Sequence, residues 1–507
     1  MKLLAPVATM LLLGAWPFIS FLGTNRDELL IYGGAVALYA VVFVAIVGFL
    51  GLIGRIILGQ TRFPAVAHVI GVGSVLLFSY LPLSFALSRM GIAFGTVKIV
   101  IWLVLSLIVL LVVWRLSRAR QTGAVLLAAA IVMTVVPAAS LVLFATSGDS
   151  GQSTVANVDP DRAGAVRLPN VYWFVFDAYA RDDVLADYFD FDNSGFIAAL
   201  EGRGFEVANQ AWSNYASTKL SISSTVSMDY YLPTAETLHP VLWTDKLQGF
   251  NPVVDRFRDL GYRYLHAEPG GNNLKTRCGG AEDACITAAS MGVIGVSEAE
   301  VGLLRLTPAF PIIRRLFPNL LSFDFTKISD VLPKLQPRPD DPLFLFAHLL
   351  TPHPPQRFNP DCSRVANIEF DLAGEDYSRQ RDSYVNDLRC LNPLIVSAVD
   401  AILERDPGDP IIILQSDHGI RGDWSRSVEG KTPRTPPSLA AYANLHAMRT
   451  PQGCDSNYGE VFSPVNTFRI VFGCIQQEKP DLLPTRRFSK TRNILDEIGD
   501  GISVREQ

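Results

Sequence analysis

Two carboxylates and a histidine follow apolar runs that lie far apart in this 507-residue chain. Asp177 directly follows the run Val171–Phe176, and Asp417 and His418 follow the run Ile411–Gln415 after a single serine. Carboxylate oxygens with one imidazole suit a divalent cation such as Mn, Mg, Ca or Zn. A lone Asp-His-Gly triplet is more often a turn with a capping aspartate, but together with Asp177 it predicts one bound divalent metal ion.

A second histidine, His353, follows a third apolar run, Leu343–Leu349, within the proline-rich segment Thr351–Pro354. Proline restricts the backbone, and loops at strand ends often carry binding and catalytic groups. We therefore predict a functional role for His353, with a structural histidine in a proline turn as the alternative. His348 lies within the run and is predicted to be structural.

The elements that position these residues can be read from the same runs. Each run is continuously apolar, which predicts a strand buried on both faces of a sheet. Amphipathic spacing over Tyr377–Glu404 predicts a helix between the second and third strands. Strands alternating with helices favour an α/β domain with a mainly parallel sheet, in which ligands collect at the carboxyl ends of the strands. Asp177, His353 and Asp417 are therefore expected to converge.

The N-terminal part of the chain has a different composition, because no Asp or Glu occurs from Leu29 to Gly148. Apolar runs of this length can cross the hydrocarbon layer of a bilayer as helices. A cleaved signal peptide at Met1–Ser20 is the alternative for the first run, although no A-x-A-like site follows it. Five transmembrane helices are predicted, near Leu3–Leu22, Leu29–Leu58, Phe63–Leu87, Ile92–Leu116 and Ala124–Ala145.

Basic residues predict the orientation of these helices, since Lys and Arg favour cytoplasmic loops. They occur before the first helix, between the second and third, and between the fourth and fifth, as Lys2, Arg55, Arg62, Arg115, Arg118 and Arg120. The N-terminus is therefore expected in the cytoplasm, as part of a multi-pass plasma membrane protein, and this membrane is the inner membrane if the host is a Gram-negative bacterium. We predict a transmembrane domain at 1–146, a linker at 147–167 and an exported domain at 168–507 on the periplasmic or extracellular side.

Cysteines test this topology independently, because disulfides persist in oxidising compartments. All six cysteines lie beyond residue 168, and up to three disulfides are possible. Local spacing favours the pair Cys278 and Cys285. The net charge of −5 and the lack of a basic tract predict no nucleic-acid partner.

Four segments resemble the alkaline phosphatase superfamily in its sulfatase-like branch, which includes lipoteichoic acid synthases and lipid A phosphoethanolamine transferases. They are VYWFVFDAYARDD, NYASTKLSIS, FAHLLTPHPP and IIILQSDHG, in that order. Five helices followed by an exported domain are also similar to those two membrane families. The resemblance implies an α/β/α sandwich, a bound metal and a nucleophile at the start of a helix.

The nucleophile implied by this resemblance is Thr218, because Thr218–Ser221 looks like the Thr-x-apolar-Ser stretch of the phosphoethanolamine transferases. Ser217 and Ser221 are the second and third choices. Metal coordination would activate the Thr218 hydroxyl, so Thr218 joins Asp177, Asp417 and His418 in the predicted ligand set. Lys219 is a candidate for binding phosphate, with a solvated lysine as the alternative.

Further substrate contacts are expected around these residues. His353 matches a substrate-binding histidine of the resembled families and is expected to protonate a leaving alkoxide or hold phosphoryl oxygens. Arg421 is a candidate clamp for phosphate, and a surface ion pair is its alternative. His446 and Asn466 lie in segments that resemble the trailing part of the fold and are candidates to reach the site.

These residues predict a membrane-anchored, metal-dependent phosphotransferase. A phosphoglycerol or phosphoethanolamine group would pass from a lipid donor through phospho-Thr218 to an envelope glycan or lipid. Two alternatives stay open, namely a sulfatase-like phosphodiesterase or sulfuric ester hydrolase and a noncatalytic envelope-assembly protein. Sulfate ester hydrolysis of the formylglycine type is disfavoured. Sulfatases of that type need a cysteine or serine in a C/S-x-P-x-R box, and no cysteine lies near Thr218.

Overall fold

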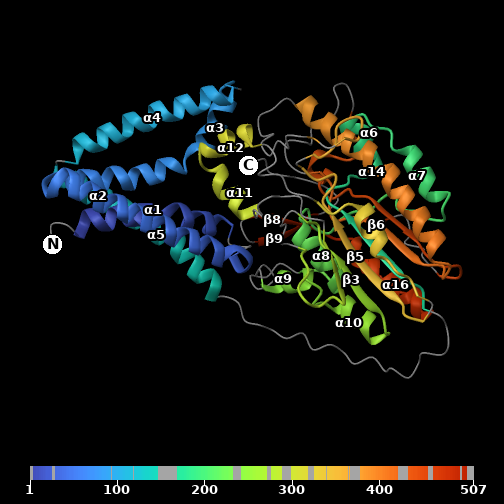
Figure 1. Cartoon of the computed structure of the whole chain (residues 1–507). Coiled ribbons are helices and arrows are strands. Elements are labelled where there is room, and N and C mark those ends of the chain that lie inside the picture. The colour runs from blue at the N-terminus through green and yellow to red at the C-terminus, as the bar shows by residue number, and fades with distance from the viewer. Residues whose placement is uncertain are drawn as a thin grey trace. The chain divides into compact units, whose positions relative to one another are not determined.

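The computed structural model (Figure 1) covers the helices of the N-terminal part and most of the C-terminal part of the chain. The residues it describes are 4–25, 29–92, 94–117, 119–146, 168–231, 241–270, 276–287, 298–317, 325–338, 340–354, 356–363, 365, 377–420, 432–454, 461–491 and 494–498.

The N-terminal part is helical. Four of the described helices are long and apolar enough to cross a membrane. They are α1 (Leu4–Thr24), α2 (Leu29–Leu77), α4 (Gly95–Leu116) and α5 (Arg120–Thr146), with the short α3 (Tyr80–Arg89) between α2 and α4.

The long α2 consists of two helices that meet at Gly59, whose φ of 76° is not helical. A Cβ atom on either Gly51 or Gly71 would lie within about 3 Å of Met10, whereas twenty residues of straight helix span ~30 Å. The two arms of α2 therefore lie side by side against α1. Together with α1, α4 and α5 they supply the five apolar helices that were predicted, and the third ends at Leu77 rather than at Leu87.

The C-terminal part contains a seven-stranded sheet with the order β2-β7-β6-β1-β5-β3-β4. The neighbours β6, β1, β5, β3 and β4 are parallel, whereas β7 runs against both β6 and β2. The strands are β1 (Val171–Phe176), β2 (Glu206–Val207), β3 (Arg263–Ala267), β4 (Ala284–Ile286), β5 (Leu343–Leu349), β6 (Ile411–Ser416) and β7 (His446–Arg449).

Both faces of this sheet are covered, because alternate side chains of the central strand β1 enter two separate cores. Tyr172, Phe174 and Phe176 pack on one face with residues of α6 (Asp182–Phe189), α7 (Ser194–Glu201) and α14 (Tyr377–Arg405). On the other face, Val171, Trp173 and Val175 pack with α8 (Thr218–Ser227), α9 (Val241–Leu247), α10 (Pro252–Asp259) and α16 (Thr467–Gln476). Figure 1 shows these two helical layers. The predicted α/β/α sandwich with a mainly parallel sheet is confirmed.

The remaining elements are short. They are α11 (Glu298–Arg305), α12 (Ala309–Leu316), α13 (Ile328–Val331), α15 (Pro437–Ala440), the 3-10 helices η4 (Leu332–Lys334) and η6 (Pro464–Asn466), and the hairpin of β8 (Arg487–Thr491) and β9 (Ile494–Ile498).

The chain forms two compact units. The membrane unit contains Met1–Asp149 and Gly292–Ser322, and the sheet unit contains Ser150–Met291 and Phe323–Gln507. The described residues 298–317, which the sequence assigned to the exported domain, are thus grouped with the apolar helices. The chain consequently passes between the units three times, although a single linker was expected.

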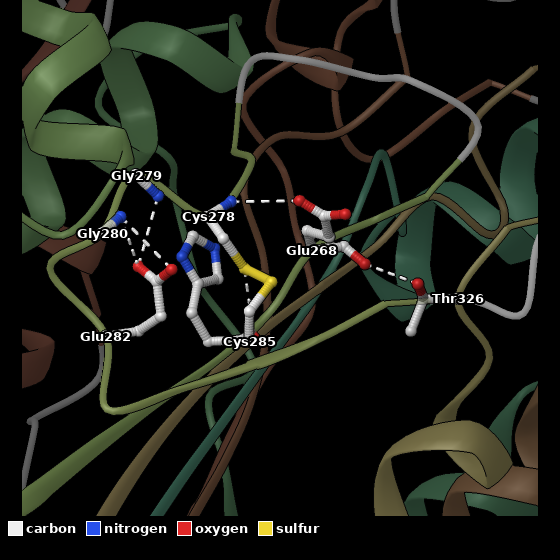
Figure 2. Close-up of a disulfide and its surroundings, with 8 residues drawn as sticks. Glu268, Cys278, Gly279, Gly280, Glu282, Cys285 and Thr326 are labelled. Atoms are coloured by element: carbon white, nitrogen blue, oxygen red, sulfur yellow. Dashed lines mark hydrogen bonds between the residues drawn. A yellow bond between two sulfur atoms is a disulfide. The ribbon is translucent and has the colours of Figure 1, made fainter. Parts of the chain in front are cut away.

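All six cysteines form disulfides within the sheet unit. The predicted pair Cys278–Cys285 is confirmed, and Cys362–Cys390 and Cys454–Cys474 are the other two. Figure 2 shows the first of these beside two glutamates that hold its loop. Glu268 accepts a hydrogen bond from the Cys278 N–H, and Glu282 accepts hydrogen bonds from the N–H groups of Gly279 and Gly280.

Candidate metal centre and nucleophile

The register of the sheet brings the predicted site residues to one edge. Phe176, the last residue of β1, is paired with Leu349 at the end of β5 and with Ser416 at the end of β6. Asp177 and Asp417 therefore follow adjacent strands at the same level. Both carboxylates are buried, at 4% and 0% exposure.

His418 lies at the centre of this group. Its Nε2 atom is 3.6 Å from Asp177 Oδ1, 3.5 Å from Asp417 Oδ2 and 3.5 Å from Thr218 Oγ1. Its Nδ1 atom is 2.7 Å from the carbonyl oxygen of Gly419. Because a carbonyl only accepts hydrogen bonds, Nδ1 donates to Gly419, and Nε2 faces the two carboxylates and Thr218. This arrangement is common in histidines that bind metal ions.

Thr218 is the first residue of α8, and its side chain is buried. The preceding residue, Ser217, is extended and forms the N-cap position, so the backbone N–H groups of the first helical turn point toward the site. A helix start of this kind stabilises an anion such as a phosphoryl group. The structure thus places the Thr218 hydroxyl at the N-terminus of a ten-residue helix and beside His418.

Ser221, the third choice for the nucleophile, has a different role in the structure. Its hydroxyl donates to the carbonyl oxygen of Asp417 at 2.5 Å, and the hydroxyl of Ser213 donates to the same oxygen at 2.6 Å. The Asp417 carboxylate is held as well, since its Oδ1 accepts from the N–H groups of Ala178 and His418. These contacts fix the direction of the Asp417 side chain.

His348 belongs to this group too, although a structural role was predicted from its position within an apolar run. Its Nε2 atom lies 3.7 Å from Asp177 Oδ2, and its Nδ1 atom lies 2.6 Å from the hydroxyl of Thr276. One ligand atom each from Asp177, His348 and Asp417 lies within 4.8 Å of the others. The signal in the sequence was an imidazole in an otherwise apolar strand, one residue before the strand ends.

The donors present fit one divalent cation. Two buried carboxylates would repel each other at this separation, and burying charge without a counterion is costly. Burial by itself would raise the pKa of Asp417, but the His418 and His348 rings and the hydrogen bonds from Thr218 and Ala178 together lower it. Asp417 is therefore held as a carboxylate, the form that binds metal. Asp177, Asp417, His418 and Thr218 supply the predicted donor set, and His348 adds a second imidazole.

His353 lies next to this group. Its ring centroid is 6.3 Å from that of His418, and its Nδ1 donates to the carbonyl oxygen of Pro354 at 2.6 Å. Arg357 holds this loop by donating to the carbonyl oxygens of His353 and Leu350. The Arg357 guanidinium also lies 3.9 Å from the centre of the Phe325 ring. The loop after β5 therefore keeps His353 beside His418.

The other predicted residues lie elsewhere or have other contacts. Lys219 is half-buried in the first turn of α8. His446 is fully buried in β7, stacked on Phe462 at 3.7 Å, and burial lowers its pKa to about 3. Both polar atoms of the Asn466 amide bond to the backbone of Leu483. Arg421 lies outside the described residues. A substrate role for these four side chains stays a prediction.

Comparison with known proteins agrees with this arrangement. The Sulfatase family matches residues 169–446, more than half of the chain, and this stretch contains Asp177, Thr218, Asp417 and His418. The chain belongs to the Sulfatase family. Membership of this family agrees with the sulfatase-like enzyme that the motifs predicted. No curated protein matches it.

Solved structures similar to this sulfatase-family protein include the following three. Phosphoethanolamine transferase EptA from Neisseria meningitidis is 14% identical, with 93% of this chain and 95% of that chain covered and a TM-score of 0.43. The periplasmic domain of EptC from Escherichia coli, in complex with Zn, is 12% identical over 66% and 94%, with a TM-score of 0.41. The lipoteichoic acid synthase LtaP from Listeria monocytogenes is 13% identical over 63% and 74%, with a TM-score of 0.39.

Proposed function

We propose that this protein is a membrane-anchored phosphotransferase that uses Thr218 as its nucleophile. The observation that carries the proposal is the position of the Thr218 hydroxyl. It lies at the start of α8 and 3.5 Å from His418 Nε2, beside the buried carboxylates of Asp177 and Asp417. This arrangement is suited to forming and holding a phosphorylated side chain.

A divalent cation held by Asp177, Asp417, His418 and Thr218 would favour the alkoxide of Thr218 and neutralise charge on the phosphoryl oxygens. In the first half-reaction, Thr218 Oγ1 bonds to phosphorus while the bond to the leaving oxygen breaks. His353, when protonated, would donate its Nε2 proton to that oxygen and keep its Nδ1–H bond to Pro354. In the second, the oxygen of an acceptor hydroxyl bonds to phosphorus, the bond from phosphorus to Thr218 Oγ1 breaks, and the proton of the acceptor passes to His353.

The donor in this proposal is a phospholipid whose headgroup carries phosphoglycerol or phosphoethanolamine, and diacylglycerol leaves. Apolar helices in the same chain support this choice, because tethering an enzyme to a bilayer raises the effective concentration of its lipid substrate. The acceptor would be an envelope glycan or lipid. In this proposal the N-terminus lies in the cytoplasm, which the basic loops favour, and the sheet unit lies outside, in the periplasm of a Gram-negative cell.

The test uses the full-length protein in nanodiscs that contain phosphatidylglycerol or phosphatidylethanolamine, with Mn²⁺, Mg²⁺, Ca²⁺ or Zn²⁺ added. Peptide mass spectrometry should find the headgroup phosphate on Thr218. Thr218→Ala should abolish the adduct, whereas Thr218→Ser keeps a hydroxyl and should retain an adduct at the same position. Ser227→Ala, at the other end of α8, is the matched control. Turnover that is unchanged in Thr218→Ala would rule the mechanism out.

A hydrolase of the same family is the second candidate, because water can replace the acceptor after the same first half-reaction. The match to the Sulfatase family is the observation that favours it. Release of free glycerol phosphate or phosphoethanolamine without any acceptor, at the rate at which the adduct decays, would identify the hydrolase. Decay that requires an added glycan or lipid acceptor would identify the transferase.

A further inference from the structure

An excursion of the chain between β4 and β5 connects the sheet unit to the membrane unit. It leaves after Ile286, whose carbonyl oxygen accepts from the Glu268 N–H, and it returns at Phe325, which is bridged to Gly270. Figure 2 shows Thr326 donating to the Glu268 carbonyl oxygen and the Cys278–Cys285 disulfide next to Glu268. Both ends of the excursion are therefore held side by side after β3.

In the described part of this excursion, α11 and Leu306 contact the apolar helices, and α12 packs against α11. The backbone N–H of Tyr80, at the start of α3, donates to the carbonyl oxygen of Leu306 at 3.1 Å. A Cβ atom on Gly302 would lie 3.2 Å from the Phe21 ring of α1, and the Tyr39 hydroxyl of α2 bonds to Glu300. Gly292–Ser322 consequently belongs to the membrane unit.

Two of these contacts also indicate how far the excursion lies from the centre of the membrane. Phe21 lies within one turn of the end of α1 at Thr24, and Tyr80 comes shortly after α2 ends at Leu77. Successive membrane helices alternate in direction. Phe21 and Tyr80 are then on the same side of the membrane as the end of α5, from which the chain continues to the sheet unit. Leu306, which joins α11 to α12, thus lies at the ends of the apolar helices, where hydrocarbon gives way to headgroups.

The side chains of α12 differ in burial and in charge. Phe310 is buried, whereas Ile312 and Leu316, one turn apart on the same side, are 45% and 64% exposed. The adjoining Phe317 is 57% exposed. The two charged residues of the helix are both basic, with Arg314 roughly opposite the exposed pair and Arg315 at the edge of that pair, next to Ile312. A short helix with exposed apolar residues and basic residues around them is typical of the bilayer interface.

We propose that α12 lies in the outer interface of the membrane. Ile312, Leu316 and Phe317 contact acyl chains, and Arg314 and Arg315 contact the phosphates of anionic headgroups. Lipid is the occupant that the surroundings favour, because α4 of the same unit exposes apolar side chains along its length, Val104 at 51% among them. Two arginines also complement an anionic lipid surface. The proposal requires membrane insertion but does not depend on the chemistry of Thr218.

The test is site-directed spin labelling of the full chain in nanodiscs of phosphatidylcholine and phosphatidylglycerol. All six native cysteines are in disulfides, so a single introduced cysteine gives a single label. Labels at Ile312→Cys and Leu316→Cys should show high access to oxygen and low access to a water-soluble nickel chelate, as at Val104→Cys. Glu201→Cys, exposed in α7, is the aqueous control and should show the reverse.

The basic residues are tested in the same system. Adding phosphatidylglycerol to phosphatidylcholine should lower nickel access at the Leu316→Cys label, and Arg314→Gln with Arg315→Gln should remove that difference. Labels at 312 and 316 that match Glu201→Cys would overturn the proposal. Labels shielded from both oxygen and nickel would also overturn it, since they would show a protein partner or a second copy of the chain on this face.

Discussion

At the scale of single residues, the site depends on hydrogen bonds that set the direction of each ligand. Gly419 fixes the His418 ring, Ser213 and Ser221 hold the Asp417 carbonyl, and Thr276 contacts His348. Such supporting contacts commonly change metal affinity by 10–100-fold when removed. The geometry therefore predicts that substitutions of residues that do not touch the metal will measurably lower metal affinity.

Thr276→Val tests this expectation for His348, because valine keeps the shape of threonine and loses its hydroxyl. We expect metal affinity to fall about tenfold, with no change in the unfolding temperature of the metal-free protein beyond a few degrees. Metal titration by calorimetry measures the affinity. Thr225→Val, in α8, is the matched control, since the Thr225 hydroxyl bonds only to the helix carbonyl of Ser221 among the described contacts. Equal affinity of Thr276→Val and wild type would leave His348 a structural residue.

Asp387 predicts a pH dependence of stability. It accepts from the N–H groups of Arg357 and Phe358, next to the His353 loop, and burial raises its pKa to about 6 from 3.8. A folded-state pKa above the unfolded value stabilises the fold at low pH, and this contribution is lost as the pH rises through about 6. Asp387→Asn keeps an acceptor oxygen but has no carboxyl group to ionise. The variant should therefore not lose stability in this way as the pH rises through about 6.

The measurement is the thermal unfolding midpoint of both proteins in detergent, at pH 4 and pH 7. We expect Asp387→Asn to unfold at a higher temperature than wild type at pH 7 and to lose the advantage at pH 4. A variant less stable than wild type at pH 7 would show that the charged Asp387 stabilises the fold, through Arg357.

At the scale of elements, the turn after β6 leaves no room for a side chain. A Cβ atom on Gly419 would lie 2.1 Å from the carbonyl oxygen of Ala440 and 2.5 Å from that of Ala443. Both are backbone atoms, so the turn must shift and move the adjacent His418. We expect Gly419→Ala to lower stability by about 1–3 kcal/mol and to weaken metal binding, measured by denaturant unfolding and metal titration.

Gly195→Ala is the control for this substitution, because a Cβ atom at Gly195 in α7 would meet nothing within 4 Å. Alanine favours the helix by up to ~1 kcal/mol, so this variant should be as stable as wild type or more stable. Normal metal binding by Gly419→Ala would contradict the close packing of the turn.

At the scale of the whole molecule, the orientation of the helices decides where the sheet unit works. Asn25 follows α1, and Gln60 lies next to the break in α2. A membrane-impermeant maleimide should label Asn25→Cys in intact cells and Gln60→Cys only after permeabilisation. The reverse pattern would place the sheet unit in the cytoplasm, where disulfides are rare.

Much of this protein follows from local patterns in its sequence. Continuous apolar runs predicted β1, β5 and β6, because a strand covered by helices on both faces needs apolar residues throughout. Length and apolarity predicted the five N-terminal helices, and short spacing predicted the Cys278–Cys285 disulfide. Asp177, Asp417 and His418 could be found because they follow such strands directly.

Tertiary structure decided what depends on contacts between distant segments. His348 comes beside Asp177 only through the register of β5 with β1, and Ser221 reaches the Asp417 carbonyl only because α8 packs beneath the end of β6. The excursion with α11 and α12 has no composition that separates it from a soluble domain. Only tertiary contacts show that it belongs with the apolar helices, because the surface that buries a helix face comes from segments distant in the sequence.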